Sequence, residues 1–177
     1  MFASPQSRLY ILRHAHSAWA LPGQRDHRRP LDERGRRDAP RLGAAIADAG
    51  YSFDVVLCST ATRAVETLEA IRTHLPPGYR EEFCDELYAL DCEAYLAKAR
   101  GQGPAASVLM IGHNPMIEQF TLALAPSGER AAIETLRDGF PTSGLAVVEF
   151  GTGLGEIAAG NGYLRRLIHP RELGPRA

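Results

Sequence analysis

The alternation of short apolar runs with longer helical segments is the feature that most restricts how this chain can fold. The apolar runs at residues 8–12, 54–58 and 107–112 are continuous rather than alternating. Such runs are typical of parallel strands that are covered by helices on both faces. Repeated strand–helix units require right-handed crossovers and a mainly parallel sheet. The sequence therefore predicts an α/β fold, a three-layer αβα sandwich.

The other expected elements are spread along the whole chain. Pro40 lies inside the first helical stretch, where it indicates either a kink or a late start of the helix. Residues 151–155 are interpreted as a turn, because their glycine spacing does not fit a dinucleotide-binding loop. Helices are expected at residues 31–49, 61–75, 92–99, 115–124 and 131–136, and further strands at residues 80–84, 145–150 and 163–168.

Size and charge indicate an ordinary globular protein with one domain, residues 1–177. A chain of 177 residues with 45% hydrophobic content can bury a sizeable core. Its formal net charge of −1 gives no electrostatic reason to expect a nucleic acid or a membrane as partner. Residues 25–37 are a local exception, with six arginines. They form either a solvated surface or a basic rim that attracts an anionic substrate.

The cysteines and the N-terminus favour a cytoplasmic location. The odd count and the absence of a CxxC pair suit a reduced protein. Residues 1–7 are too short and polar for a signal peptide, and no apolar run approaches the roughly 20 residues of a membrane helix.

Cys58 precedes Arg63 by one residue fewer than the cysteine precedes the arginine in the loop of cysteine phosphatases. We therefore interpret Cys58 as a buried strand residue.

Two histidines and two arginines follow the ends of three apolar runs. Arg13 and His14 come after the first run, Arg63 after the second and His113 after the third. In an open parallel sheet the carboxyl ends of neighbouring strands meet at one crevice. Four cationic or proton-carrying groups in one crevice indicate a phosphoryl group as the ligand.

Each of these residues suits phosphoryl chemistry, although each alone could be structural. The Arg13 guanidinium disfavours protonation of His14, and a neutral imidazole is the nucleophilic form. The forked guanidinium of Arg63 can grip two phosphate oxygens. Asn114 begins a helix whose N-terminal amides favour an anion near His113. A zinc site is disfavoured by the neighbouring arginines, although four histidines could be proposed for it: His14, His16, His27 and His113.

The same segments resemble the motifs of the histidine phosphatase superfamily, which includes the phosphoglycerate mutases. The resemblance extends from residue 9 to about residue 118, with the motifs in the expected order. The compact size and the LRHAHS motif are most similar to SixA-type phosphohistidine phosphatases, and a phosphoglycerate mutase-like fold is implied. The segments are residues 12–17 (LRHAHS), 29–35 (RPLDERG) with 37–39 (RDA), 59–64 (STATRA) and 112–115 (GHNP).

The resemblance implies a phosphatase that needs no metal or other cofactor. His14 would attack phosphorus and become phosphohistidine, and water would then release phosphate. The phosphoryl oxygens would be bound by Arg13, Arg63 and His113, and further substrate contacts are expected from His16, Ser17 and Asn114. The family usually has an acid after the second helix, which makes Glu86 our choice of general acid and Asp85 the next. To act as a general acid, such a carboxyl group needs a raised pKa. The alternative is an ordinary carboxylate exposed on a loop, whose pKa is not raised.

Three functions stay open for the sequence. The chain has no room for the long insertions that close the pocket of the mutases, so a shallow crevice is expected. A shallow crevice favours a phosphohistidine that is part of a protein. A phosphatase of small monoesters, such as sugar or nucleotide phosphates, is the first alternative, and a non-catalytic phosphate-binding module is the second. His16 stands where many relatives have Glu or Gln, and its role, like the oligomeric state, is not assigned.

Overall fold

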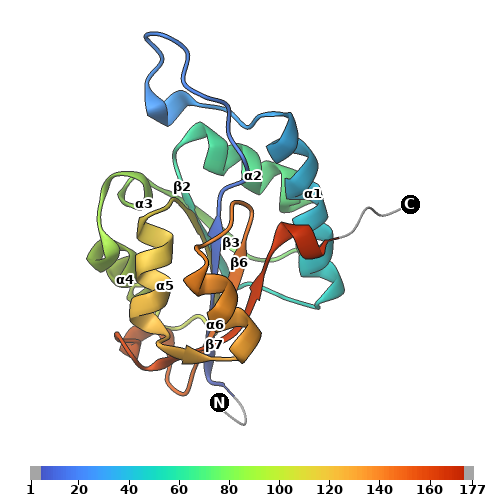
Figure 1. Ribbon diagram of the computed structural model, residues 1–177. Helices are drawn as coiled ribbons and strands as arrows, with labels where there is room; N and C mark the ends of the chain where they lie inside the picture. The colour runs from blue at the N-terminus through green and yellow to red at the C-terminus, as the bar shows by residue number, and fades with distance from the viewer. Residues whose placement is uncertain (1–4, 174–177) are drawn as a thin grey trace.

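The computed structural model describes residues 5–173 and contains a seven-stranded sheet with helices on both faces (Figure 1). The strands are β1 (Ser7–Arg13), β2 (Val55–Ser59), β3 (Arg80–Cys84), β4 (Ser107–Gly112), β5 (Ser127–Gly128), β6 (Leu145–Phe150) and β7 (Gly162–Ile168). Their order across the sheet is β3-β2-β4-β1-β6-β7-β5. The first four are parallel, and β6 runs antiparallel to both of its neighbours. The predicted α/β fold with a mainly parallel sheet is confirmed.

Six α-helices connect the strands in the described part of the chain. They are α1 (Glu33–Asp48), α2 (Thr62–Arg72), α3 (Glu86–Ala89), α4 (Cys92–Arg100), α5 (Met116–Leu124) and α6 (Arg130–Arg137). Short 3-10 helices occur at Asp26–Arg28, Leu154–Glu156 and Pro170–Glu172. The prediction missed α3 and β5, and the expected turn at residues 151–155 includes the start of the second 3-10 helix.

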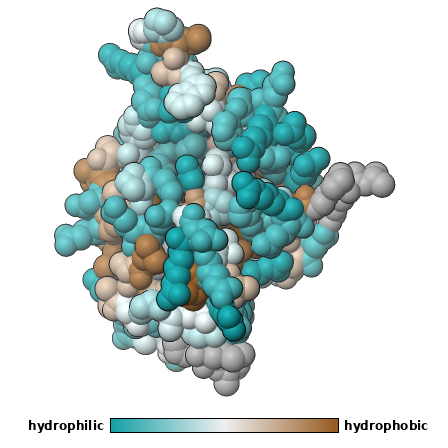
Figure 2. Space-filling model, in the orientation of Figure 1, coloured by the Kyte–Doolittle hydropathy of each residue, from teal (hydrophilic) through white to brown (hydrophobic). Residues whose placement is uncertain are grey.

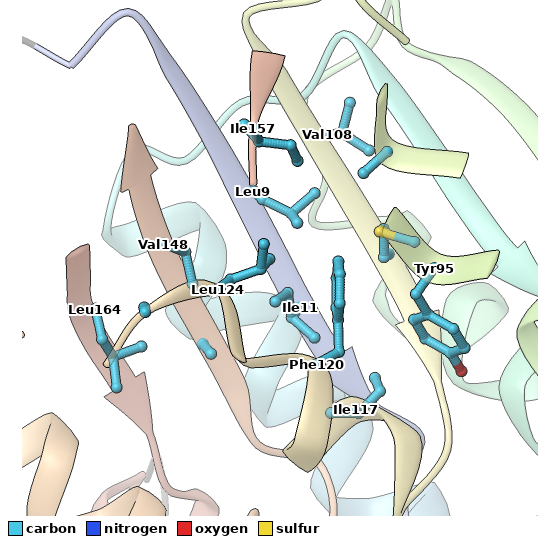
Figure 3. Packing of buried hydrophobic residues seen from close by; sticks show 14 of the residues in the cluster. Leu9, Ile11, Tyr95, Val108, Ile117, Phe120, Leu124, Val148, Ile157 and Leu164 are labelled. Atoms are coloured by element: carbon cyan, nitrogen blue, oxygen red, sulfur yellow. The ribbon is translucent and has the colours of Figure 1, made fainter. Parts of the chain in front are cut away.

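Alternate residues of the central strands face two separate apolar clusters. Leu9 and Ile11 of β1 point into a cluster with residues of α4 and α5, among them Phe120 (Figure 3). Tyr10 and Leu12 point to the other face and pack with residues of α1 and α2. Full burial of one such side chain contributes about 1.5–3 kcal/mol. Helices therefore cover both faces of the sheet, and the three-layer arrangement is confirmed.

The start of α1 is fixed by its N-cap. The Asp32 carboxylate accepts a hydrogen bond from the Gly35 backbone N–H at 2.8 Å, which satisfies one of the unpaired amides of the first turn. The helix continues through Pro40. Of the two alternatives for Pro40, the late start is wrong, because the N-cap at Asp32 lies eight residues earlier.

Other features of the described chain concern its cysteines and its apolar segments. Cys58 is fully buried on β2, as expected, and burial raises the pKa of its thiol. Cys84 is also buried and Cys92 is half-buried, and all three are free thiols. Between residues 5 and 173, no helix has the length and apolar character needed to span a membrane.

Candidate active site

The carboxyl ends of β1, β2 and β4 surround a cavity of about 380 Å³. The four residues singled out at the strand ends all line it, and so do the three further substrate-binding candidates. The complete lining is Arg13, His14, His16, Ser17, Trp19, Asp26, Arg29, Arg63, His113, Asn114 and Thr142. A larger cavity of about 550 Å³ lies by the amino ends of the strands, next to Ser7 and Ser107, away from these residues.

The two ring nitrogens of His14 have different roles: Nδ1 carries the proton and Nε2 has the lone pair. Its Nδ1 lies 2.7 Å from the Ala15 carbonyl oxygen, which can only accept, so Nδ1 carries the proton. Arg63 Nε donates to His14 Nε2 at 3.2 Å. Burial, followed by the charges of Arg63 and Arg13, lowers the pKa of His14 to about 3. The imidazole is therefore neutral near pH 7, with its Nε2 lone pair beside a guanidinium.

Arg63 lies in the first turn of α2 and is held by the loop that follows β1. Its NH1 donates to the Asp26 carbonyl oxygen at 2.8 Å and its NH2 to the Asp26 carboxylate at 3.0 Å. Arg29 and Tyr88 also donate to this carboxylate, at 2.7 and 3.2 Å. Burial acts to raise the pKa of Asp26, but these hydrogen bonds and charges outweigh it and lower the pKa to about 2.

Asp26 and Arg29 are site residues that sequence reasoning did not single out. Arg29 belongs to the recognised RPL segment, and Asp26 is the acid that precedes it in the arginine-rich stretch. One acid of three in an arginine-rich stretch is a weak signal for such a role. Its contact with Arg63 spans 37 positions in the chain, which no local pattern reveals.

Arg13 and His113 complete the ring of polar groups. Arg13 NH1 donates to the Phe140 carbonyl oxygen at 2.6 Å. The His113 Nε2 lies 2.7 Å from Ser59 Oγ, and its ring centroid is 4.9 Å from that of His14. Burial, then the neighbouring His14 and Arg63, lowers the pKa of His113 to about 2. The buried Arg13 Nε and His113 Nδ1 have no hydrogen-bond partner within residues 5–173.

The remaining substrate-binding candidates have protein partners of their own. Ser17 Oγ accepts from Arg29 NH2 at 3.0 Å. His16 Nδ1 lies 2.5 Å from an Asp32 carboxylate oxygen, next to the N-cap of α1. The amide nitrogen of Asn114 donates to Glu118 at 3.1 Å. These contacts fix the side chains around the cavity.

The general acid is where the sequence interpretation needs correction. Glu86 does not line the cavity, and its carboxylate lies 3.1 Å from the Lys98 ammonium. A hydrogen bond to its own backbone N–H, followed by Lys98, lowers the pKa of Glu86, so the raised pKa that its role requires is contradicted. Asp85, the second choice, accepts from Thr60 Oγ1 at 2.5 Å and also lies outside the lining.

The zinc alternative has no support in the geometry. Within residues 5–173, no three His, Cys, Asp or Glu side chains are grouped so that they could hold a metal ion. The four histidines considered for such a site do not form one. Arg13 and Arg63 instead place fixed positive charge around the cavity, which suits an anion.

Comparisons with known proteins agree with this geometry. Residues 9–93 match the histidine phosphatase superfamily (branch 1). An uncharacterized protein of Mycobacterium tuberculosis is 35% identical over 163 residues, which cover 90% of this chain and 100% of that protein. A crystal structure from Agrobacterium tumefaciens, assigned to the phosphohistidine phosphatase SixA, has a TM-score of 0.79 and 35% identity, with 93% of this chain and 99% of that chain covered. The protein histidine phosphatase SixA complexed with tungstate has a TM-score of 0.77 and 25% identity, with 94% and 99% covered.

The fold, the arginine–histidine cavity and these relatives define a phosphatase. More particularly, the chain belongs to the histidine phosphatase superfamily. The resemblance seen in the sequence, SixA-type proteins included, is confirmed, as is the phosphoglycerate mutase-like fold.

Proposed function

We propose that this protein removes the phosphoryl group from phosphohistidine in a protein, without a metal, through a phosphohistidine formed at His14. The observation that carries this proposal is the position of the proton on the His14 ring and the contact of its other ring nitrogen. Its proton is held on Nδ1 by the Ala15 carbonyl, and its Nε2 faces the Arg63 guanidinium. A nucleophile and an oxyanion-binding group are therefore in contact before substrate enters.

The reaction has two balanced steps. His14 Nε2 forms a bond to phosphorus, and the bond between phosphorus and the substrate nitrogen breaks with its electron pair on that nitrogen. Water then attacks the phosphorus of the enzyme phosphohistidine, and the bond between phosphorus and His14 Nε2 breaks with its electron pair on Nε2. Both protons of the water leave with orthophosphate, and His14 returns to its starting form. Throughout both steps, Nδ1 keeps its proton and donates it in a hydrogen bond to the Ala15 carbonyl oxygen.

The cationic groups supply most of the expected rate enhancement. Arg13 and Arg63 are placed to bind the equatorial oxygens, and their charge is fixed in position before the reaction. The incoming phosphoryl group competes with Arg63 for the Nε2 lone pair, so the Arg63 N–H becomes available to a phosphoryl oxygen. His113 adds a neutral hydrogen-bonding group, since its pKa is lowered to about 2.

The protonation state of Asp26, the carboxyl group in the cavity, favours a phosphoramidate substrate over a phosphate ester. Asp26 is the carboxylate among the described lining residues, and its pKa of about 2 keeps it ionised. An alkoxide leaving group needs an acid to protonate it. An imidazole that carries a proton on its second ring nitrogen leaves as a neutral molecule and needs none. This difference supports phosphohistidine as the substrate.

The test compares phosphate release from a histidine-phosphorylated protein with release from a panel of sugar and nucleotide monophosphates. We expect a higher kcat/KM for the phosphoprotein and a phosphoryl label on the enzyme that is lost in His14→Ala. Circular dichroism of the variant checks that it is folded. Retained turnover in folded His14→Ala would contradict the proposal, and preference for the small esters would favour the first alternative. Tight vanadate binding without any labelled enzyme would favour the phosphate-binding module.

A further inference from the structure

The loop between β1 and α1 presents exposed apolar side chains next to the cavity. It stands clear of the rest of the molecule (Figure 1), and brown, hydrophobic atoms lie at its tip (Figure 2). Trp19 is 89% exposed and Leu21 is 69% exposed, the two largest values among the exposed large hydrophobic residues of the described chain. Exposure of two neighbouring large apolar side chains is costly in water and marks a candidate interaction surface.

Hydrogen bonds hold this loop in shape without burying its tip. Backbone pairing closes its base, where Ala18 N–H donates to the Pro30 carbonyl at 3.0 Å. Near the tip, Gln24 N–H donates to the Leu21 carbonyl at 2.9 Å, and the Gln24 side chain accepts from Leu21 N–H at 3.0 Å. The apolar tip is therefore pre-organised, which lowers the entropic cost of binding a partner.

The loop is also part of the reaction centre. Trp19 lines the cavity, and Asp26 of the same loop holds Arg63 by two hydrogen bonds. A phosphoryl group carried by a large molecule can reach His14 only if that molecule lies against the cavity rim. The exposed tip is placed to contact such a carrier.

Charge defines the kind of carrier. Arg25 and Arg28 of this loop are exposed and, within the described residues, form no ion pair and no side-chain hydrogen bond. Unpaired arginines beside an apolar tip match a surface that is acidic and has an apolar patch.

We infer that Trp19, Leu21, Arg25 and Arg28 form a docking surface for an acidic protein that carries the phosphohistidine. The inference rests on the proposed function and goes further, because it assigns recognition of the carrier to residues outside the reacting groups. Leu21 and the two arginines would contribute to binding of the carrier and leave the reaction at His14 unchanged.

The test compares cleavage of the same phosphorus–nitrogen bond in a phosphorylated protein and in a free phosphorylated amino acid. Substrates are a small acidic protein phosphorylated on a surface histidine, and free phosphohistidine. Leu21→Ser and Arg25→Glu are each expected to lower kcat/KM on the phosphoprotein by about tenfold and to leave the value on free phosphohistidine within about twofold. Leu122→Ser on α5 is the matched control, since Leu122 is an exposed leucine outside the loop, and neither substrate should distinguish it from the wild type.

The outcomes separate this inference from the proposed function. If the wild type acts on the phosphoprotein and both loop variants keep full activity on it, the docking surface is contradicted and the proposed function stands. An equal loss on both substrates also contradicts docking, because it places the defect in the reaction itself. If the wild type acts on free phosphohistidine or small esters but not on the phosphoprotein, both proposals fail.

Discussion

Arg63 connects the nucleophile to the loop between β1 and α1. Through its Nε it contacts His14, and through its two terminal nitrogens it contacts the backbone and the carboxylate of Asp26. A planar guanidinium can make these three contacts at once because its donors point outward in fixed directions. The position of this one side chain therefore sets the geometry of the cavity.

Replacement of Arg63 by Lys tests this geometry with the charge retained. An ammonium group cannot reproduce the fork, so we expect kcat/KM to fall by about 10²–10³, the usual cost of removing one donor to a transition-state oxyanion. Steady-state kinetics measure the effect. Arg72→Lys is the control on the same helix, since Arg72 is exposed and pairs with Glu81 on the surface. A small loss in Arg63→Lys, matching the control, would contradict the assigned role.

The secondary-structure elements show how far sequence patterns predict the protein. The strands at residues 107–112 and 145–150 agree with the expected bounds, because buried strands have clear apolar patterns. The strand at residues 80–84 also agrees, although Cys84 is its one buried residue. The strand ends also located four of the residues that line the cavity: Arg13, His14, Arg63 and His113. The four-residue helix α3 and the two-residue strand β5 are too short for any periodicity.

The choice of Glu86 as general acid came from the resemblance, which implies an acid in the segment after the second helix. The position of that segment in space is set by tertiary contacts. Lys98 on α4 draws the Glu86 carboxylate to itself. The contact of Asp26 with Arg63 is equally non-local, and sequence spacing carries no information about it.

Gly35 on α1 provides a test at the scale of an element. Alanine normally stabilises a helix relative to glycine by about 1 kcal/mol. At Gly35, however, a Cβ would lie 2.0 Å from the backbone oxygen of His16. We expect Gly35→Ala to lower the free energy of unfolding by about 1–3 kcal/mol, as other overpacking changes do.

Urea unfolding with a matched glycine measures this effect. Gly101 follows α4, and a Cβ there would come no closer than 3.4 Å to the nearest atom. Gly101→Ala should therefore leave the stability near that of the wild type. Equal stability of the two variants would show that the close approach of α1 to the His16 backbone does not constrain the fold.

At the scale of the whole molecule, the two buried histidines of the cavity couple stability to pH. Both have pKa values lowered from 6.5, to about 3 for His14 and about 2 for His113, with burial as the main cause. Below pH 6.5 the unfolded chain takes up protons at these positions and the folded protein does not. Stability is therefore lost as the pH falls. The lowered pKa of Asp26, about 2, affects stability only below its ordinary value of 3.8.

Between pH 6 and 4 we expect the free energy of unfolding to fall with each unit of acidification. Each histidine contributes up to about 1.4 kcal/mol per pH unit. Urea unfolding at pH 6, 5 and 4 measures the slope. His14→Asn removes one of the two groups, so its slope should be smaller than that of the wild type by up to the same amount. An unchanged slope in the variant would show that His14 takes up its proton equally well in both states.

Trp19 gives the protein an intrinsic optical probe. It is the single tryptophan of the chain, and it lies at the edge of the cavity with 89% of its surface exposed. Tryptophan emission depends on hydration of the indole, so a carrier protein without tryptophan should shift the emission to shorter wavelength when it binds. Unfolding leaves an already hydrated indole hydrated and should change the emission little. The fluorescence of this protein would then follow encounters at its surface rather than the integrity of its core.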